Sequence, residues 1–372
     1  MEGILLDISS ALFQPFSIGS LTLPNRIVMA PMTRAFSPDG VPGPNVAAYY
    51  RRRAENGVGL IVTEGTLINH PAAGSHPDWP NIHGEDALQG WSKVVDAVHK
   101  AGGRIIPQLW HIGMMRNIGD PPNPEVRPIG PSGLSLSGVQ VTEPMSDSEI
   151  SAVIDAYAQG AANAQRLGFD GLEIHGAHGY LIDQFLWENT NRRTDRYGGD
   201  LVRRTRFAAE VVAACRRAVG PGFPIVFRFS QWKTGHYTVK LAENPDQLAK
   251  LLAPLTDAGV DMFHCSTRRY WEPEFEGSPL NLAGWTKKLT GKPTITVGSV
   301  GLDGDVVSSL SEGKGAQATH IQLLMERLEN EEFDLVAVGR ALLADPEWAA
   351  KIREGRLSEL IPYTPEALNT LV

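Results

Sequence analysis

One pattern constrains this chain of 372 residues more than any other: a short, nearly continuous apolar segment followed by an amphipathic helical segment, repeated eight times. Apolar runs of this kind indicate strands of a parallel sheet that is buried on both faces. The helical segments carry apolar stripes at spacings of three and four, as in Ile150, Val153, Ile154 and Tyr157. Eight such units predict an α/β fold of the (β/α)8 TIM barrel type.

An open doubly wound sheet is the competing α/β fold, but no GxGxxG turn follows the first strand to mark a dinucleotide crevice. We therefore expect one barrel domain over residues 1–372, with an N-terminal hairpin lid at 13–23 and a long loop at 120–144 after the third strand. The predicted strands, each with its helix, are 25–33 with 44–57, 59–63 with 85–101, 104–109 with 146–167, 171–174 with 201–219, 224–229 with 245–258, 260–264 with 282–289, 294–297 with 322–328, and 334–338 with 345–353.

Composition excludes several classes of function. With 34 basic and 42 acidic residues the net charge is −8, and the one short basic run, residues 51–53, is typical of a solvated helix turn, so we expect no nucleic acid partner. The first ten residues, MEGILLDISS, lack a basic region and a cleavage site, and no apolar run is of membrane-spanning length. We expect a cytoplasmic protein without a membrane partner. Two cysteines are too few for a zinc or iron–sulfur cluster, so redox chemistry would need another cofactor.

In a barrel of this kind the reactive groups gather at the carboxyl ends of the strands. The polar, aromatic and glycine residues at those positions are expected to meet at one mouth. They are Thr33, Gln108, Trp110, His175, His178, Arg228, Gly298, Ser299, Gly339 and Arg340.

The segment 171–199 concentrates this chemistry. His175 ends a predicted strand, and Gly176 and Gly179 are expected to break the backbone, so that His175, His178 and Tyr180 would lie on a loop. Two imidazoles can donate to one carbonyl oxygen, and a phenol with an ordinary pKa of about 10 can supply a proton at neutral pH. Two alternatives stay open here: a satisfied surface turn, and a metal site of the histidines with Asp183, for which no HExxH motif is present.

Two further features indicate an anionic ligand. Arg228 stands between Phe227 and Phe229, and burying a guanidinium there is costly unless an anionic group accompanies it. The turns at 298–299 and 339–340 follow strands seven and eight, where barrels of this type recurrently bind phosphate.

Together these residues resemble the old yellow enzyme family, the FMN-dependent ene-reductases, over nearly the whole chain. The resemblance rests on several motifs in this order. They are Asn25 to Arg34 (NRIVMAPMTR), Gln108 to His111 (QLWH), His175 to Leu181 (HGAHGYL) with Gln184 to Leu186, Asn191 with Arg193, Asp195 and Tyr197, and Phe333 to Arg340 (FDLVAVGR).

The resemblance implies a non-covalent FMN, reduced by NADPH or NADH, that passes hydride to an α,β-unsaturated carbonyl compound or a similar activated alkene. The implied cofactor-binding residues are Pro31, Met32 and Gly65 through the main chain, Thr33 at flavin O4, Gln108 at the pyrimidine edge, Arg228 at N1 and the ribityl chain, and Gly298, Ser299, Gly339 and Arg340 at the phosphate. The implied substrate-binding and catalytic residues are His175 and His178 at the carbonyl oxygen, Tyr180 as proton donor, and Trp110 beside them.

Other functions compete with this prediction. One is a metal-dependent barrel lyase or hydrolase that uses His175 and His178; another is a flavin-binding protein without turnover. A larger iron–sulfur relative that reduces dienoyl-CoA is disfavoured by the lack of a cysteine cluster. We expect no resident metal and a monomer or homodimer. The sequence specifies neither the enone nor the preferred nicotinamide.

Overall fold

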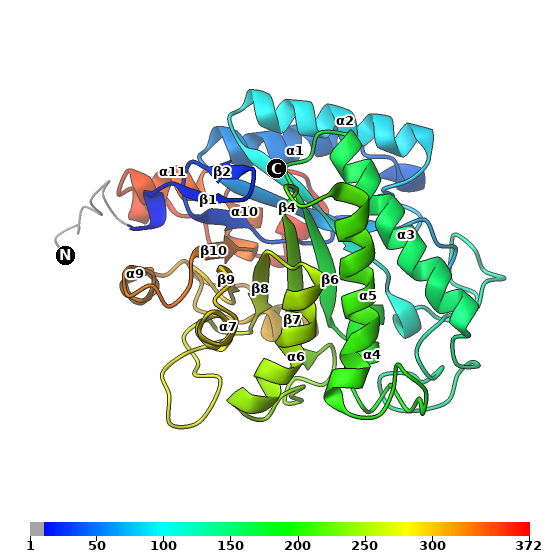
Figure 1. Cartoon of the computed structure of the whole chain (residues 1–372). Helices are drawn as coiled ribbons and strands as arrows, with labels where there is room; N and C mark the ends of the chain where they lie inside the picture. The colour runs from blue at the N-terminus through cyan, green and yellow to red at the C-terminus, as the bar shows by residue number, and fades with distance from the viewer. Residues whose placement is uncertain (1–10) are drawn as a thin grey trace.

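The computed structural model describes residues 11–372, apart from the side chains of residues 310 and 311. The prediction made from the first ten residues therefore lies outside the described part. Eight parallel strands close into a barrel in the order β10, β3, β4, β5, β6, β7, β8, β9, and helices surround it (Figure 1). The predicted (β/α)8 fold is confirmed.

The barrel strands agree with the predicted segments in number and order, and several run further. They are β3 (Ile27–Met29), β4 (Leu60–Leu67), β5 (Arg104–Trp110), β6 (Leu172–His178), β7 (Ile225–Lys233), β8 (Met262–Ser266), β9 (Thr294–Val297) and β10 (Leu335–Val338). All residues of β4, and nearly all of the other barrel strands, are buried, as their apolar runs predict.

The predicted helices are present as well. They are α1 (Pro44–Glu55), α2 (Glu85–Lys100), α3 (Asp147–Arg166), α5 (Leu201–Val219), α6 (Pro245–Ala258), α7 (Leu282–Thr290), α9 (Gln322–Glu329) and α11 (Trp348–Arg353). Three short helices were not predicted: α4 (Leu181–Leu186), α8 (Val306–Glu312) and α10 (Arg340–Ala344). Short 3-10 turns occupy Ala11–Phe13, Pro38–Gly40, Gly113–Met115, Leu357–Glu359 and Pro365–Asn369.

Local sequence signals set the helix ends. The Ser146 side chain accepts from the Glu149 N–H, and the Glu149 carboxylate accepts from the Ser146 N–H, which completes a capping box at the start of α3. At the start of α6 the Asn244 side chain accepts from the Gln247 N–H, and Gly259 ends that helix with φ +110°. These caps fix where α3 and α6 begin and where α6 ends.

The predicted N-terminal hairpin, β1 (Phe16–Ile18) and β2 (Leu21–Leu23), is confirmed as an antiparallel pair. Leu21 and Leu23 are buried in one apolar cluster with residues at or near the amino-terminal ends of the barrel strands, among them Val28, Leu60 and Val226. The hairpin therefore closes the amino-terminal end of the barrel. The strand ends that carry the predicted site lie at the opposite end.

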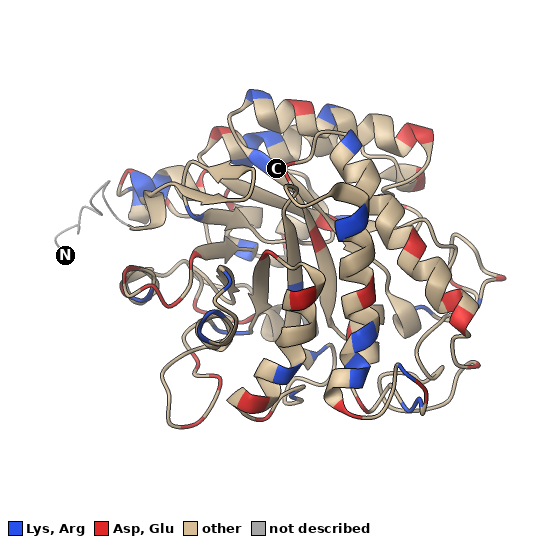
Figure 2. Ribbon diagram, viewed as in Figure 1, with Lys and Arg blue, Asp and Glu red and all other residues tan. Residues whose placement is uncertain are grey.

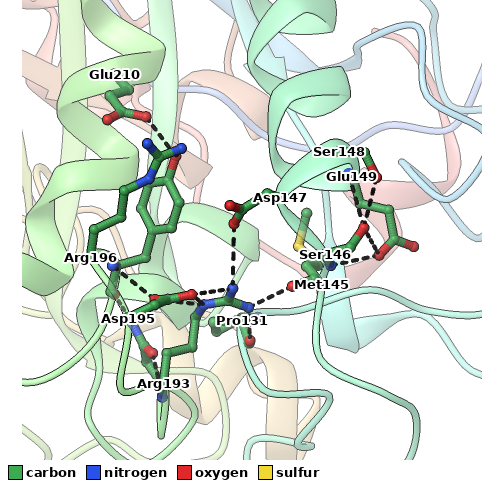
Figure 3. A network of polar contacts seen from close by, with 12 residues as sticks. Pro131, Met145, Ser146, Asp147, Ser148, Glu149, Arg193, Asp195, Arg196 and Glu210 are labelled. Atoms are coloured by element: carbon green, nitrogen blue, oxygen red, sulfur yellow. Dashed lines mark hydrogen bonds and ion pairs between the residues drawn. The ribbon is translucent and has the colours of Figure 1, made fainter.

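The long segment between β5 and α3 is also confirmed as a loop region, and an arginine ties it to the rest of the chain (Figure 3). Arg193 donates to the Pro131 carbonyl at 2.8 Å and the Met145 carbonyl at 2.6 Å. The same guanidinium pairs with Asp195 at 2.5 Å, whose carboxylate also accepts the Tyr197 N–H. The motif residues after α4 thus hold the insertion against the segment that follows β6.

Basic and acidic residues are both spread over the outer helices and loops, while the ribbon of the barrel strands carries few of them (Figure 2). The exposed basic turn expected at residues 51–53 is only partly present. Arg51 is exposed, but Arg53 is fully buried and donates to the Leu342 and Leu343 carbonyls, because α1 packs against the segment after β10. Among residues 11–372 no helix combines the length and the apolar character that crossing a bilayer requires.

Candidate active site

A cavity of about 380 Å³ opens at the carboxyl ends of the barrel strands, within the size range of small-ligand and cofactor sites. Every residue that the sequence predicts for the site borders this cavity. They are Pro31, Met32, Thr33, Gly65, Gln108, Trp110, His175, His178, Tyr180, Arg228, Gly298, Ser299, Gly339 and Arg340. The structure therefore brings the predicted set together at one place.

The backbone that carries the histidines differs from the prediction. Strand β6 continues through His175 to His178, so neither imidazole lies on a loop. The strand is distorted where its register shifts between Gly176 and His178, and His178 has φ +65°. Tyr180 then precedes α4 as its N-cap residue. A distorted strand end, held by the pairing with β7, places these side chains more rigidly than a loop would.

The His175 ring is buried, with 5% of its surface exposed. Its Nδ1 accepts a hydrogen bond from the Ala177 N–H at 3.3 Å. Since a backbone N–H can only donate, Nδ1 carries no proton, and the neutral ring bears its proton on Nε2. Burial lowers the pKa of His175 well below its usual value, and the positive charge of Arg228 lowers it further. His175 is thus a neutral hydrogen-bond donor.

Three contacts hold His178 in place. Its main-chain N–H donates to the Ser230 hydroxyl at 3.0 Å, and its Nε2 lies 2.8 Å from the Ser266 hydroxyl oxygen. The Trp232 indole stacks on the imidazole, with ring centroids 4.4 Å apart. Burial, and after it the Arg228 charge, lowers the pKa of His178 well below its usual value. This imidazole is therefore also neutral at physiological pH.

The Tyr180 ring meets His175 edge to face, with centroids 4.9 Å apart, and meets Trp110 in the same manner at 5.0 Å. Within the described chain no hydrogen bond engages its hydroxyl. Burial raises the pKa of Tyr180 to about 12, although the charge of Arg228 acts in the opposite direction. The phenol keeps its proton throughout the physiological range and can deliver it to a bound molecule.

Arg228 lies in β7 with 6% of its surface exposed. Its register partners are His175 on β6 and His264 on β8. Residues 11–372 provide neither a hydrogen bond nor a salt bridge to its guanidinium, and its buried Nε has no partner. A buried guanidinium with unsatisfied donors at a cavity wall fits a ligand that is anionic or rich in acceptors.

Beside it, Gln108 donates from its amide nitrogen to the Glu173 carboxylate at 2.7 Å. The other carboxylate oxygen of Glu173 lies 2.7 Å from Nδ1 of His264. Because an ionised carboxylate only accepts, the Gln108 amide is oriented with its nitrogen toward Glu173. Its carbonyl oxygen is then free to accept from a ligand in the cavity.

The far end of the cavity has the features of an anion cradle. Gly298 has φ +143°, and a Cβ there would come within 2.7 Å of the Thr267 carbonyl oxygen, so only glycine fits. In the described chain no hydrogen bond occupies the main-chain N–H groups of Gly298, Ser299 and Gly339. Arg340 adds a positive charge, although it donates to the Gly304 and Asp305 carbonyls. Free N–H groups beside a guanidinium fit a phosphate.

Asp183, the third ligand of the alternative metal site, is engaged by other residues. The Asp183 carboxylate pairs with Lys233 at 2.9 Å, both side chains being fully buried, and it also accepts the Gly179 N–H at 2.7 Å. Among residues 11–372 no group of three or more His, Cys, Asp and Glu side chains is placed to hold a metal ion. Asp183 instead anchors the turn that precedes Tyr180.

Sequence reasoning missed part of the cavity wall. Ser266 ends β8, and the rule used for the other strand ends would have found it. Trp232 lies on the extension of β7, which the prediction ended too early. Tyr363 and Leu368 come from the segment after the last helix, and no motif marks them. The aromatic side chains of Tyr270 and Trp271, in the loop after β8, do not border the cavity.

The closed parallel barrel, with a cavity at the carboxyl ends of its strands, places the chain among the (β/α)8 barrel proteins. Residues 11–359 match the model of the NADH:flavin oxidoreductase / NADH oxidase family. The chain belongs to this family, that of the old yellow enzymes.

Similar structures support the assignment. Morphinone reductase in complex with tetrahydroNAD superposes with a TM-score of 0.79 at 31% identity, over 96% of this chain and 94% of that one. The old yellow enzyme homologue from Zymomonas mobilis gives 0.78 at 26% identity, over 96% of each chain.

Curated relatives agree. The NADH oxidase of Thermoanaerobacter brockii is 36% identical over 94% of this chain and 52% of its own length. The putative 12-oxophytodienoate reductase 2 of Oryza sativa is 42% identical over 56% of either protein. The chain thus spans about half the length of these relatives, whereas it covers 90% of the flavin oxidoreductase hxnT of Emericella nidulans, at 33% identity over 92% of this chain.

Proposed function

We propose that the protein is an FMN-dependent ene-reductase, which uses NADPH or NADH to reduce the activated C=C bond of an α,β-unsaturated carbonyl compound. One observation carries the proposal: two neutral imidazoles and a protonated phenol converge on a cavity whose wall holds an unpaired buried guanidinium. Relatives named morphinone reductase and 12-oxophytodienoate reductase are consistent with this reaction class.

The cavity residues fit FMN. Arg228 would lie against the electron-rich side of the flavin, where its charge favours the anionic reduced form. The remaining cofactor contacts are divided among three groups. They are Pro31, Met32, Thr33 and Gly65 at the flavin ring, Gln108 at its pyrimidine edge, and Gly298, Ser299, Gly339 and Arg340 at the phosphate. When reduced, the bound FMN would supply the hydride.

The chain's own groups would bind and activate the alkene. His175 and His178 donate to the carbonyl oxygen and stabilise the negative charge that develops on it in the transition state. Trp110 packs against the substrate, and Tyr180 protonates the α-carbon. A neutral donor pair is suited to this role because it strengthens its hydrogen bonds as charge develops. The cytoplasmic location and the monomer or homodimer state expected from the sequence belong to the same proposal.

The test is visible absorbance under anaerobic conditions, followed through addition of NADPH and then of 2-cyclohexenone. The proposal expects a flavin spectrum that bleaches with NADPH and returns with the enone. In Tyr180→Phe the bleaching persists and the return slows by roughly 10²-fold or more, because one proton donor is removed. A protein that takes up no FMN contradicts the cofactor assignment, and an unchanged return in Tyr180→Phe contradicts the proton donor.

A further inference from the structure

We infer that Ser266 is a positioning residue that selects the tautomer of His178, so that the ring presents an N–H to a carbonyl oxygen in the cavity. The inference rests on the proposed function for the identity of the bound group. It concerns the tautomer of one of the two histidines, since the two rings are held in their tautomers by different partners.

His175 needs no side-chain partner, because the Ala177 N–H fixes its tautomer. His178 has no such backbone donor at its ring. Its only ring hydrogen bond within the described chain joins Nε2 to the Ser266 hydroxyl oxygen at 2.8 Å. Nδ1 of His178 is therefore the nitrogen left for a ligand, and it can donate only when Nε2 carries no proton.

The hydroxyl of Ser266 decides between the two tautomers. This residue is 3% exposed, and the described residues offer its hydroxyl proton no acceptor other than Nε2 of His178. If Nε2 were protonated, the serine O–H would have no acceptor among the described residues and could donate only into the cavity that both residues border. If the serine donates to Nε2, its proton is satisfied and the His178 proton lies on Nδ1.

The surroundings keep both groups in place. The Trp232 indole stacks on the His178 ring and donates from Nε1 to the main-chain carbonyl of Ser266 at 3.2 Å. Ser266 also ends β8, where it pairs in register with Ser230, the residue whose hydroxyl accepts the His178 N–H. Trp232 therefore packs on the imidazole and fixes the main chain of Ser266 at the same time, while the serine hydroxyl itself is held by its bond to Nε2.

The first readout is the protonation of the two His178 ring nitrogens, measured by ¹⁵N NMR of the FMN-loaded protein with His178→Gln to assign the signals. In the wild type we expect a protonated Nδ1 and an unprotonated Nε2. Ser266→Ala removes the donor, and the Nε2-protonated form becomes populated. Ser266→Thr keeps a hydroxyl and restores the wild-type pattern. A wild-type ring protonated on Nε2 overturns the inference, whatever the activity.

The second readout is affinity for cyclohexanone, a ketone that cannot be reduced at a C=C bond. Ser266→Ala should weaken its binding roughly fivefold to tenfold, the effect of one hydrogen bond, and raise KM for 2-cyclohexenone similarly. If the tautomer shifts while ketone affinity does not, the inferred link to carbonyl binding is wrong. If the wild type reduces no enone, the proposed function fails, and the NMR pattern still decides the role of Ser266.

Discussion

At the scale of single residues, burial determines the protonation states on which the site depends. His175 and Tyr180 are both shifted toward their neutral forms, the imidazole by a lowered pKa and the phenol by a raised one. Arg228 lies nearby, and no carboxylate among residues 11–372 forms an ion pair with its guanidinium, although the charge of Glu173 acts on it from a distance. The sequence predicted which groups meet, but these shifts depend on how deeply each group is enclosed, which no local pattern records.

Glu64 provides a test of the same physics outside the reaction. It lies buried in β4, and one of its carboxylate oxygens accepts the main-chain N–H groups of Arg34 at 2.8 Å and Ala35 at 3.1 Å, just after Thr33 at the cavity. Burial raises the pKa of Glu64 to about 7, although these hydrogen bonds act in the opposite direction. The folded state therefore retains a proton that the unfolded state releases near pH 4.5.

Its contribution to stability is fully present below about pH 4.5 and is lost as pH rises to about 7. We expect the free energy of unfolding of the wild type, minus that of Glu64→Gln, to fall by about 3 kcal/mol between pH 4.5 and 8. Denaturant titrations at several pH values measure this difference. Glu55→Gln, which removes an exposed carboxylate on α1, serves as the surface control measured in parallel. A constant difference for Glu64→Gln would exclude a raised pKa.

At the scale of elements, the strand and helix units were predictable because their apolar periodicity is strong. Short helices such as α4 and α10 were missed, since six and five residues give no usable period. The extension of β6 through His178 was missed for a different reason. Gly176 and Gly179 are ordinary strand breakers, yet pairing with β7 keeps the strand going. Tertiary contacts override the local preference there.

The hairpin illustrates a role that sequence could not assign. It was expected as a lid, and it closes the barrel at the end remote from the cavity. Leu23→Ala should therefore lower the free energy of unfolding by about 2–5 kcal/mol, because it leaves a hole in a fully buried position. The affinity for FMN should not change. Chemical denaturation and flavin titration measure the two effects.

Thr22→Ala is the matched control, since Thr22 is exposed between two buried leucines of the same strand. It should change the free energy of unfolding by no more than about 0.5 kcal/mol. A parallel loss of FMN affinity in Leu23→Ala would show that the hairpin supports the cavity as well as the core.

At the scale of the whole molecule, the cavity collects residues from the ends of all the barrel strands, from Pro31 after β3 to Gly339 after β10. The cavity is therefore bordered by the full circumference of the barrel. If the chain is a single domain, as the sequence predicts, FMN should shift one cooperative thermal transition upward. Saturation at a hundred times Kd corresponds to about 2.7 kcal/mol of added stability.

A variant of Arg228 should affect the stability of the free protein and that of the FMN-bound protein in opposite directions. Without FMN its buried, unpaired charge costs free energy, so Arg228→Met should unfold at a Tm equal to or higher than that of the wild type. With FMN present the order should reverse, because the variant lacks the guanidinium that we propose to face the cofactor. Scanning calorimetry with and without FMN measures both. A variant that is less stable without FMN would show that Arg228 supports the fold itself. The inference of an anionic ligand at this wall would then be wrong.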